Sequence, residues 1–251
     1  MVDFGGQAAV TGEPYRIIGT PRFGGVLIIA DHASNRVPDD IDLGIDPALL
    51  DLHIAQDIGV MGVAGLMAQR PGTAAFLGNV SRLVCDFNRE EHAPAIIPIA
   101  SDGHAVPGNG LSHEAHLARI ERFYHPYHAA LAALLDDTPP ALILSLHSFT
   151  PSLASSDEPR PWQVGILYNQ DDRAARLAIP MLEADGLVVG DQQPYSGKLL
   201  NATMNRHAEA EGRPYLGVEI RQDGIADGAG QAVWAERLGR ICNAVALGAG
   251  D

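Results

Sequence analysis

The stretch VLIIADHASNRVP, residues 26–38, begins as a strand and ends in a cluster of polar side chains. Its first five residues form an unbroken apolar run, which is typical of a strand covered on both faces of a sheet. Asp31, His32 and Asn35 follow, and Pro38 blocks a simple continuation of regular structure. Ligands of open α/β sheets bind at the carboxyl ends of the strands. The stretch therefore predicts an α/β fold with a site at this strand end.

Strand-like and helix-like segments alternate along the rest of the chain, which favours a single α/β domain over residues 1–251. The expected strands are 26–30, 81–87, 141–149, 162–169, 186–191 and 215–223. The expected helices are 47–70, 112–135, 171–184 and 231–247. The Pro- and Gly-rich region 91–110 is expected to be an ordered loop.

The net charge of −14 argues against a nucleic acid or an anionic membrane as partner. No apolar run approaches the ~20 residues that span a bilayer, and the N-terminal stretch lacks the pattern of a signal peptide. The two cysteines, Cys85 and Cys242, form no CxxC pair, so a reduced cytoplasmic setting is expected. Cys85 lies in an apolar segment, which favours a buried structural cysteine over a nucleophile.

Three expected strands end in ionisable pairs: Asp31-His32, His147-Ser148 and Glu219 with Arg221. One such end is ordinary, but three in one domain indicate a shared site. Asp57 is expected on the apolar face of the 47–70 helix, where an acid needs a partner or a metal. His53 lies one turn earlier, so a buried His–Asp pair that stabilises the helix is an equally good interpretation.

Nine segments follow one another along the chain in a fixed order: ADHASNRVP, HIAQDIGVMG, SRLVCDFNR, DGHAVPGN, HPYH, LHSFTP, RPWQVGILYN, QPYSG and VEIRQDGI. In this order they resemble the N-formylglutamate amidohydrolases, from about Val26 to the final helix. That family is similar in fold to zinc carboxypeptidases and aspartoacylase-type deacylases. The resemblance implies a mixed, mainly parallel sheet with helices on both faces. It also implies hydrolysis of N-formyl-L-glutamate to formate and L-glutamate, within histidine degradation.

The resemblance further implies one divalent metal, for which Zn²⁺ is the expectation. His32 and His147 match the two histidine ligands of the wider superfamily. Asn35 stands where that superfamily has a glutamate ligand, and an amide is a poor zinc ligand compared with a carboxylate. Asp57 is therefore the preferred third ligand, with Asn35 and His53 as the alternatives.

Glu219 matches the catalytic glutamate of the carboxypeptidases and is expected to transfer protons. Arg82 or Arg221 is expected to stabilise the oxyanion. The Asn88-Arg89 pair resembles the pair that holds the terminal carboxylate of a substrate, although a surface arginine paired with a local acid is common. The expected substrate-binding residues are Asn35, Asn88, Arg89, Tyr195 and His207.

Three other functions stay open at this point. The first is a related metal-dependent deacylase or carboxypeptidase that acts on another N-acyl amino acid. The second is a metal-independent amidase that uses Cys85 or a serine. The third is a catalytically inactive protein that binds acyl amino acids, which Asn35 in place of glutamate would fit. In each case the expected partner is a small N-acyl amino acid.

Overall fold

The computed structural model describes residues 12–248, so both ends of the expected domain, 1–11 and 249–251, lie outside the described residues. The strands of the main sheet are β1 Tyr15–Gly19, β2 Val26–Ala30, β3 Thr73–Gly78, β6 Leu142–Phe149, β7 Val164–Leu167, β8 Val189–Asp191 and β9 Tyr215–Arg221. They form one sheet in the order β1-β3-β2-β6-β9-β7-β8. β1 is antiparallel to β3 and β7 to β9, whereas the other neighbours are parallel. The expected mixed, mainly parallel sheet is confirmed.

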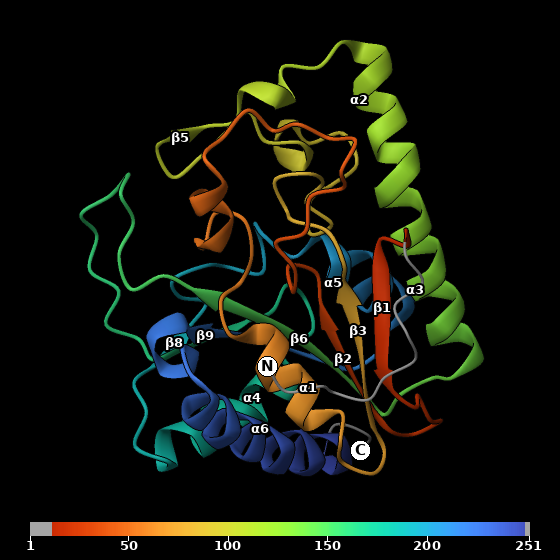
Figure 1. Cartoon of the computed structure of the whole chain (residues 1–251). Helices are drawn as coiled ribbons and strands as arrows, with labels where there is room; N and C mark the ends of the chain where they lie inside the picture. The colour runs from red at the N-terminus through yellow and green to blue at the C-terminus, as the bar shows by residue number, and fades with distance from the viewer. Residues whose placement is uncertain (1–11, 249–251) are drawn as a thin grey trace.

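Helices cover both faces of this sheet (Figure 1). Their bounds are α1 Val60–Met67, α2 His113–Arg119, α3 His125–Asp137, α4 Arg173–Ala184, α5 Ala202–His207 and α6 Gly228–Gly248. One face of β2, including Ile28, packs in a core with residues of α1, α4 and α6. The other face, including Leu27 and Ile29, packs in a second core with residues of α3 and α5. Burial on both faces explains the unbroken apolar run of β2.

Three parallel neighbours, β2, β6 and β9, form the centre of the sheet. Because they run in one direction, their carboxyl ends lie at the same edge. In the β6–β9 ladder, His147 is paired with Glu219, so the two side chains emerge beside each other on one face. The backbone thus brings the polar ends of three distant segments together.

The long helix expected over 47–70 is wrong in its first half. A 3-10 turn covers Pro47–Asp51, and the α-helix begins only at Val60. The backbone between them bonds to neighbouring loops: Asp57 N–H donates to the His32 carbonyl at 2.9 Å, and Ala55 C=O accepts from Arg82 N–H at 3.2 Å. Helical hydrogen bonds are therefore replaced by bonds that fix Asp57 beside His32.

The strand expected over 81–87 is also wrong, because that segment is a series of buried turns. The strand of this region is β3, at Thr73–Gly78, which pairs with β2. β3 contains two alanines and a glycine, which are uncommon in strands, so its sequence does not predict a strand. The helix expected over 112–135 is confirmed as α2 and α3 joined by a π-turn, Ile120–Tyr124, with Ser112 as the N-cap.

β1 and α5 were not predicted from the sequence, whereas most other elements agree with expectation. Six elements overlap the ranges expected for them: β6, β7, β8, β9, α4 and α6. Region 91–110 is a loop that holds a small hairpin of β4 Ala100–Ser101 and β5 His104–Ala105. Within residues 12–248, no helix combines the length and the apolar character that crossing a membrane requires.

Gly59 marks the point where the chain turns from the Asp57 segment into α1. Its φ is +82°, and a β-carbon there would lie 2.2 Å from the Ile225 carbonyl oxygen. We expect Gly59→Ala to lower the free energy of unfolding by roughly 2–5 kcal/mol, since backbone strain and steric overlap add. Urea unfolding measures this loss.

Gly72 provides the matched control, because its φ is +78° but no atom lies within 4 Å of the β-carbon position. Gly72→Ala should lower the free energy of unfolding by only about 1–2 kcal/mol. Equal losses at the two glycines would contradict the close contact between the Gly59 turn and Ile225.

Candidate active site

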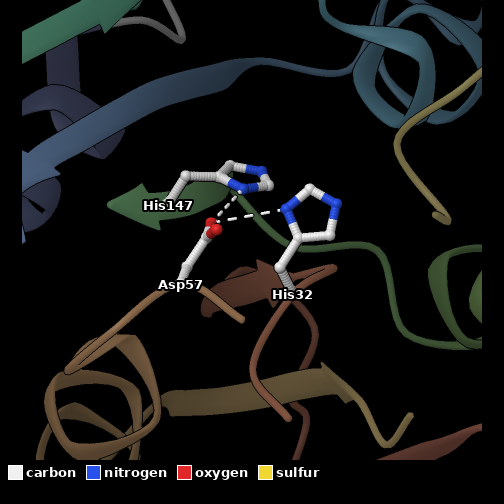
Figure 2. Close-up of side chains that lie close together, drawn as sticks. All are labelled: His32, Asp57 and His147. Carbon is white, nitrogen blue, oxygen red and sulfur yellow. Dashed lines mark hydrogen bonds and ion pairs between the residues drawn. The ribbon is translucent and has the colours of Figure 1, made fainter. Parts of the chain in front are cut away.

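Two imidazoles and one carboxylate converge at the carboxyl edge of the sheet. Asp57 Oδ2 lies 2.9 Å from His147 Nδ1 and 3.4 Å from His32 Nδ1 (Figure 2). Each of these three residues is at most 5% exposed to solvent. Each residue offers one atom that could bind a metal, and these three atoms lie within 4.8 Å of one another. The structure therefore brings together the three residues predicted to hold the metal.

The position of Asp57 is fixed by β2 and β6. Its backbone N–H donates to the carbonyl of His32, directly after β2. Its Oδ2 also accepts from the Ser148 N–H at 3.3 Å, and the Ser148 hydroxyl donates to the Ile58 carbonyl at 2.9 Å. Residues next to both histidines thus hold the carboxylate between the two strand ends.

A second carboxylate lies behind each imidazole. Asp86 Oδ1 is 2.7 Å from His32 Nε2, and Asp31 Oδ2 is 3.5 Å from His147 Nε2. Asp31 is itself held by hydrogen bonds from Tyr127 and Thr203 to its Oδ1. Carboxylates in this position orient histidine ligands and make them more basic. Here they leave both Nδ1 atoms directed at Asp57.

The charges in this cluster stabilise one another. Burial alone would lower the pKa of His147, but Asp31 and Asp57 raise it well above its usual value. Burial would raise the pKa of Asp57, but His32 and His147 hold it far below its usual range. The cluster therefore favours a carboxylate between two protonated imidazoles.

The chemistry of this donor set fits a divalent metal. Two imidazole nitrogens and one carboxylate oxygen form a recognised set of protein ligands for catalytic Zn²⁺. Each histidine has an outer carboxylate, which metal-binding histidines commonly have. Among the described residues, buried Asp31 Oδ2 and His147 Nε2 have no well-formed hydrogen-bond partner. Release of the two imidazole protons would accompany metal binding.

Glu219 lies beside this cluster and is 9% exposed. In the described part of the chain, its buried Oε2 has no hydrogen-bond partner. Burial, opposed by the charge of His147, raises the pKa of Glu219 to about 7. A carboxyl group with such a pKa can both accept and donate a proton near neutral pH.

A pocket opens in front of Glu219 and the three converging residues. Its lining includes four of the other predicted residues, Arg82, Asn88, Arg89 and Tyr195. Arg82 donates to Asp86 at 2.8 Å and lies 3.5 Å from Asp57 Oδ1. Arg89 is held more loosely, 3.7 Å from Asp86, with one hydrogen bond to the Asn88 carbonyl. Polar donors thus line the wall beside the acidic cluster.

Three predicted site residues lie outside this pocket. The Asn35 amide donates to Asp51 at 3.2 Å. Buried His207 Nε2 is 2.9 Å from His128 Nδ1. Arg221 is turned away and held by Asp223. The structure thus provides no contact for them with the cluster.

His53 and Cys85 also have local roles. His53 lines the pocket, but its Nε2 lies 3.0 Å from Asp102 and it forms no pair with Asp57. The expected His53–Asp57 pair on one helix face is wrong, because the helix is absent there. Cys85 is fully buried, and burial raises the pKa of its thiol well above the usual value. This disfavours an amidase that uses Cys85 as the nucleophile.

Sequence reasoning assigned no role to the two outer carboxylates, Asp31 and Asp86. Both adjoin predicted residues: Asp31 precedes His32, and Asp86 lies between Arg82 and Asn88. A buried acid next to a candidate histidine ligand was the available signal. Arg160 was missed as well; it bonds to the Tyr195 hydroxyl at 3.1 Å.

The site combines two histidines and one carboxylate with an adjacent glutamate, a set of groups suited to metal-assisted hydrolysis. Comparison with known proteins identifies the family of the chain. A family model described as N-formylglutamate amidohydrolase matches residues 24–226. The chain belongs to this family and is a hydrolase of amide bonds.

Two solved structures are similar over nearly the whole chain. A gene product from Agrobacterium tumefaciens is 27% identical, with a TM-score of 0.88, over 96% of this chain and 97% of that one. An N-formylglutamate amidohydrolase from Ralstonia eutropha JMP134 is 19% identical, with a TM-score of 0.68, over 93% and 97%. No curated protein matches the chain. The structural similarity supports the fold at both levels of identity.

The buried His128–His207 pair produces a testable pH dependence. Burial lowers the pKa of His128 to about 3 and that of His207 to about 4, from 6.5. Both imidazoles stay neutral in the folded protein. In the unfolded chain the same histidines have a higher pKa and therefore take up protons at a higher pH. The stabilisation is therefore complete above pH ~6.5 and is lost as the pH falls towards about 4.

Between pH 7 and pH 4 the wild-type protein loses part of its unfolding free energy through this pair. We expect His207→Gln to lose roughly 3 kcal/mol less over the same interval, because one depressed pKa is removed. Urea unfolding at a series of pH values measures the slope. His113→Gln, on an exposed histidine, is the control and should leave the slope unchanged. A slope that His207→Gln does not alter would contradict a neutral buried pair.

Proposed function

We propose that this protein is a metal-dependent hydrolase that converts N-formyl-L-glutamate to formate and L-glutamate. The observation that carries the proposal is the buried convergence of His32, Asp57 and His147 next to Glu219. Membership of the N-formylglutamate amidohydrolase family supports the substrate. A cytoplasmic location and a role in histidine degradation remain predictions from the sequence.

His32 and His147 would hold one Zn²⁺ through their Nδ1 atoms, and Asp57 through its carboxylate. When bound, the ion supplies Lewis acidity, which polarises a carbonyl group and lowers the pKa of water towards ~7. Asp86 holds the His32 ring through its Nε2, and Asp31 lies 3.5 Å behind the Nε2 of His147. The ligand set is therefore built from strand ends and supported from behind.

Glu219 would carry the proton through the reaction. Its carboxylate accepts a proton from the water whose oxygen attacks the formyl carbon. It then donates that proton to the glutamate nitrogen as the C–N bond breaks. Burial raises the pKa of Glu219 above its usual value, which favours uptake of a proton from the attacking water.

The arginines would bind the negative charges of the reaction and of the substrate. Arg82 is held by Asp57 and Asp86, so its guanidinium is fixed beside the reacting carbonyl oxygen. Fixed donors stabilise developing charge without reorganising during the reaction. Arg89 and Asn88 would hold the α-carboxylate of the substrate, since both line the pocket and Arg89 is held only loosely by Asp86, at 3.7 Å.

Metal analysis and turnover test the proposal directly. Purified protein should contain one divalent metal per chain and release formate from N-formyl-L-glutamate. Chelation should abolish turnover, and added Zn²⁺ should restore it. Asp57→Ala should lose both the metal and the activity, since one of three ligands is removed. Turnover that survives complete metal removal would rule out the metal-dependent mechanism.

Glu219→Gln separates proton transfer from metal binding. The amide keeps the size of the side chain but cannot accept the proton. We expect kcat to fall by about 10²–10⁴-fold while the metal content stays at one per chain. Glu236→Gln, an exposed change on α6, is the control and should retain full activity. Near-normal turnover in Glu219→Gln would exclude this residue as the base.

A further inference from the structure

Arg160 differs from the other arginines around the site in its electrostatic partners. Arg82 is paired with Asp57 and Asp86, Arg89 lies near Asp86, and Arg221 is paired with Asp223. Arg160 donates instead to two neutral groups, the Thr150 carbonyl at 3.2 Å and the Tyr195 hydroxyl at 3.1 Å. Over residues 12–248, no carboxylate forms an ion pair with it.

Arg160 is not itself a lining residue of the pocket, but the groups that it contacts belong to the pocket wall. Its guanidinium carbon lies 5.1 Å from the ring centre of Tyr195 and 5.9 Å from that of Phe149. Phe149, Thr150 and Tyr195 line the pocket that contains Glu219. Burial lowers the pKa of His53, another lining residue, and the charges of Arg82 and Arg160 add to this lowering against Asp102. The Arg160 guanidinium thus lies directly behind the part of the wall that Phe149, Thr150 and Tyr195 form.

Tyr195 extends the reach of this cation. Its hydroxyl accepts a hydrogen bond from Arg160, so it retains its own proton to donate. Burial raises the pKa of Tyr195, which keeps the phenol protonated. A guanidinium and an adjacent O–H donor match the two oxygens of one carboxylate.

We propose that Arg160 and Tyr195 form the subsite that recognises the side-chain carboxylate of an acidic N-acyl amino acid. The inference rests on the proposed function. N-formyl-L-glutamate carries two carboxylates, and the Arg89 and Asn88 pair accounts for one of them. Arg160 supplies the second positive charge from behind Tyr195, and within residues 12–248 no carboxylate is paired with it that would compete.

The test compares N-formyl-L-glutamate with N-formyl-L-glutamine, which has the same shape and a neutral side chain. Metal-loaded wild-type protein should prefer the glutamate substrate in kcat/KM. Arg160→Gln should lower kcat/KM for N-formyl-L-glutamate by roughly 10–100-fold, the value of a charge-assisted contact. It should change the value for N-formyl-L-glutamine by less than about threefold, so that selectivity is lost.

Arg176 offers a closely matched control. It also stacks on a tyrosine, 5.5 Å from the ring centre of Tyr168, and donates to that hydroxyl at 3.3 Å. It differs in being paired with Asp172, and its tyrosine, unlike Tyr195, does not line the pocket. Arg176→Gln should leave both substrates and their ratio unchanged. Arg160→Lys keeps the charge and should retain part of the preference, whereas Tyr195→Phe should lose about 3–10-fold of it.

These outcomes separate recognition from a structural role of Arg160. Equal losses on both substrates, or no loss on either, would overturn the inference while leaving the proposed function intact. A wild-type protein that does not distinguish the two substrates would also overturn it. If Arg160→Gln does not fold, the lysine and phenylalanine variants decide the question. Wild-type protein that hydrolyses no N-formyl amino acid would overturn the proposed function and this inference together.

Discussion

The carboxylate of Asp57, held between two buried imidazoles, is the interaction on which the rest of the site depends. Its Oδ2 contacts His147 and His32 at once, although His147 lies in β6 and His32 follows β2. An uncompensated buried carboxylate would be strongly destabilising. The pair of imidazoles compensates it, and in turn requires the outer acids Asp31 and Asp86. The network is complete only when the sheet has brought all its members together.

The sheet can bear this network because both its faces are covered by large apolar cores. β2 is buried along its whole length, and so is β6. Strands packed on both faces have little conformational freedom, so the side chains at their ends are held in well-defined positions. The loops contribute the more variable parts: Arg89 and Tyr195 reach the pocket from segments outside the sheet. The strands thus position the buried cluster, and the loops contribute Arg89 and Tyr195 to the pocket wall.

The sequence was most informative where a residue's environment follows from the local pattern. The apolar runs of β2, β6 and β9 predicted the strands, and the polar residues after them predicted His32, His147 and Glu219 as a group. Asp57 was selected through a helix that does not exist, since the bonds that shape its segment come from His32 and Arg82. Asn35, His207 and Arg221 follow family motifs but point elsewhere. No local pattern encodes which of several nearby acids will face an imidazole.

The register of β6 against β9 has a consequence for how this enzyme family can diversify. His147 and Glu219 are direct partners in a parallel ladder, so their separation is set by the spacing between strands. A slip of one residue would turn Glu219 to the opposite face of the sheet. The distance between His147 and Glu219 is therefore protected from changes in loop length. The loops that carry Arg89, Arg160 and Tyr195 can lengthen or shorten without altering it.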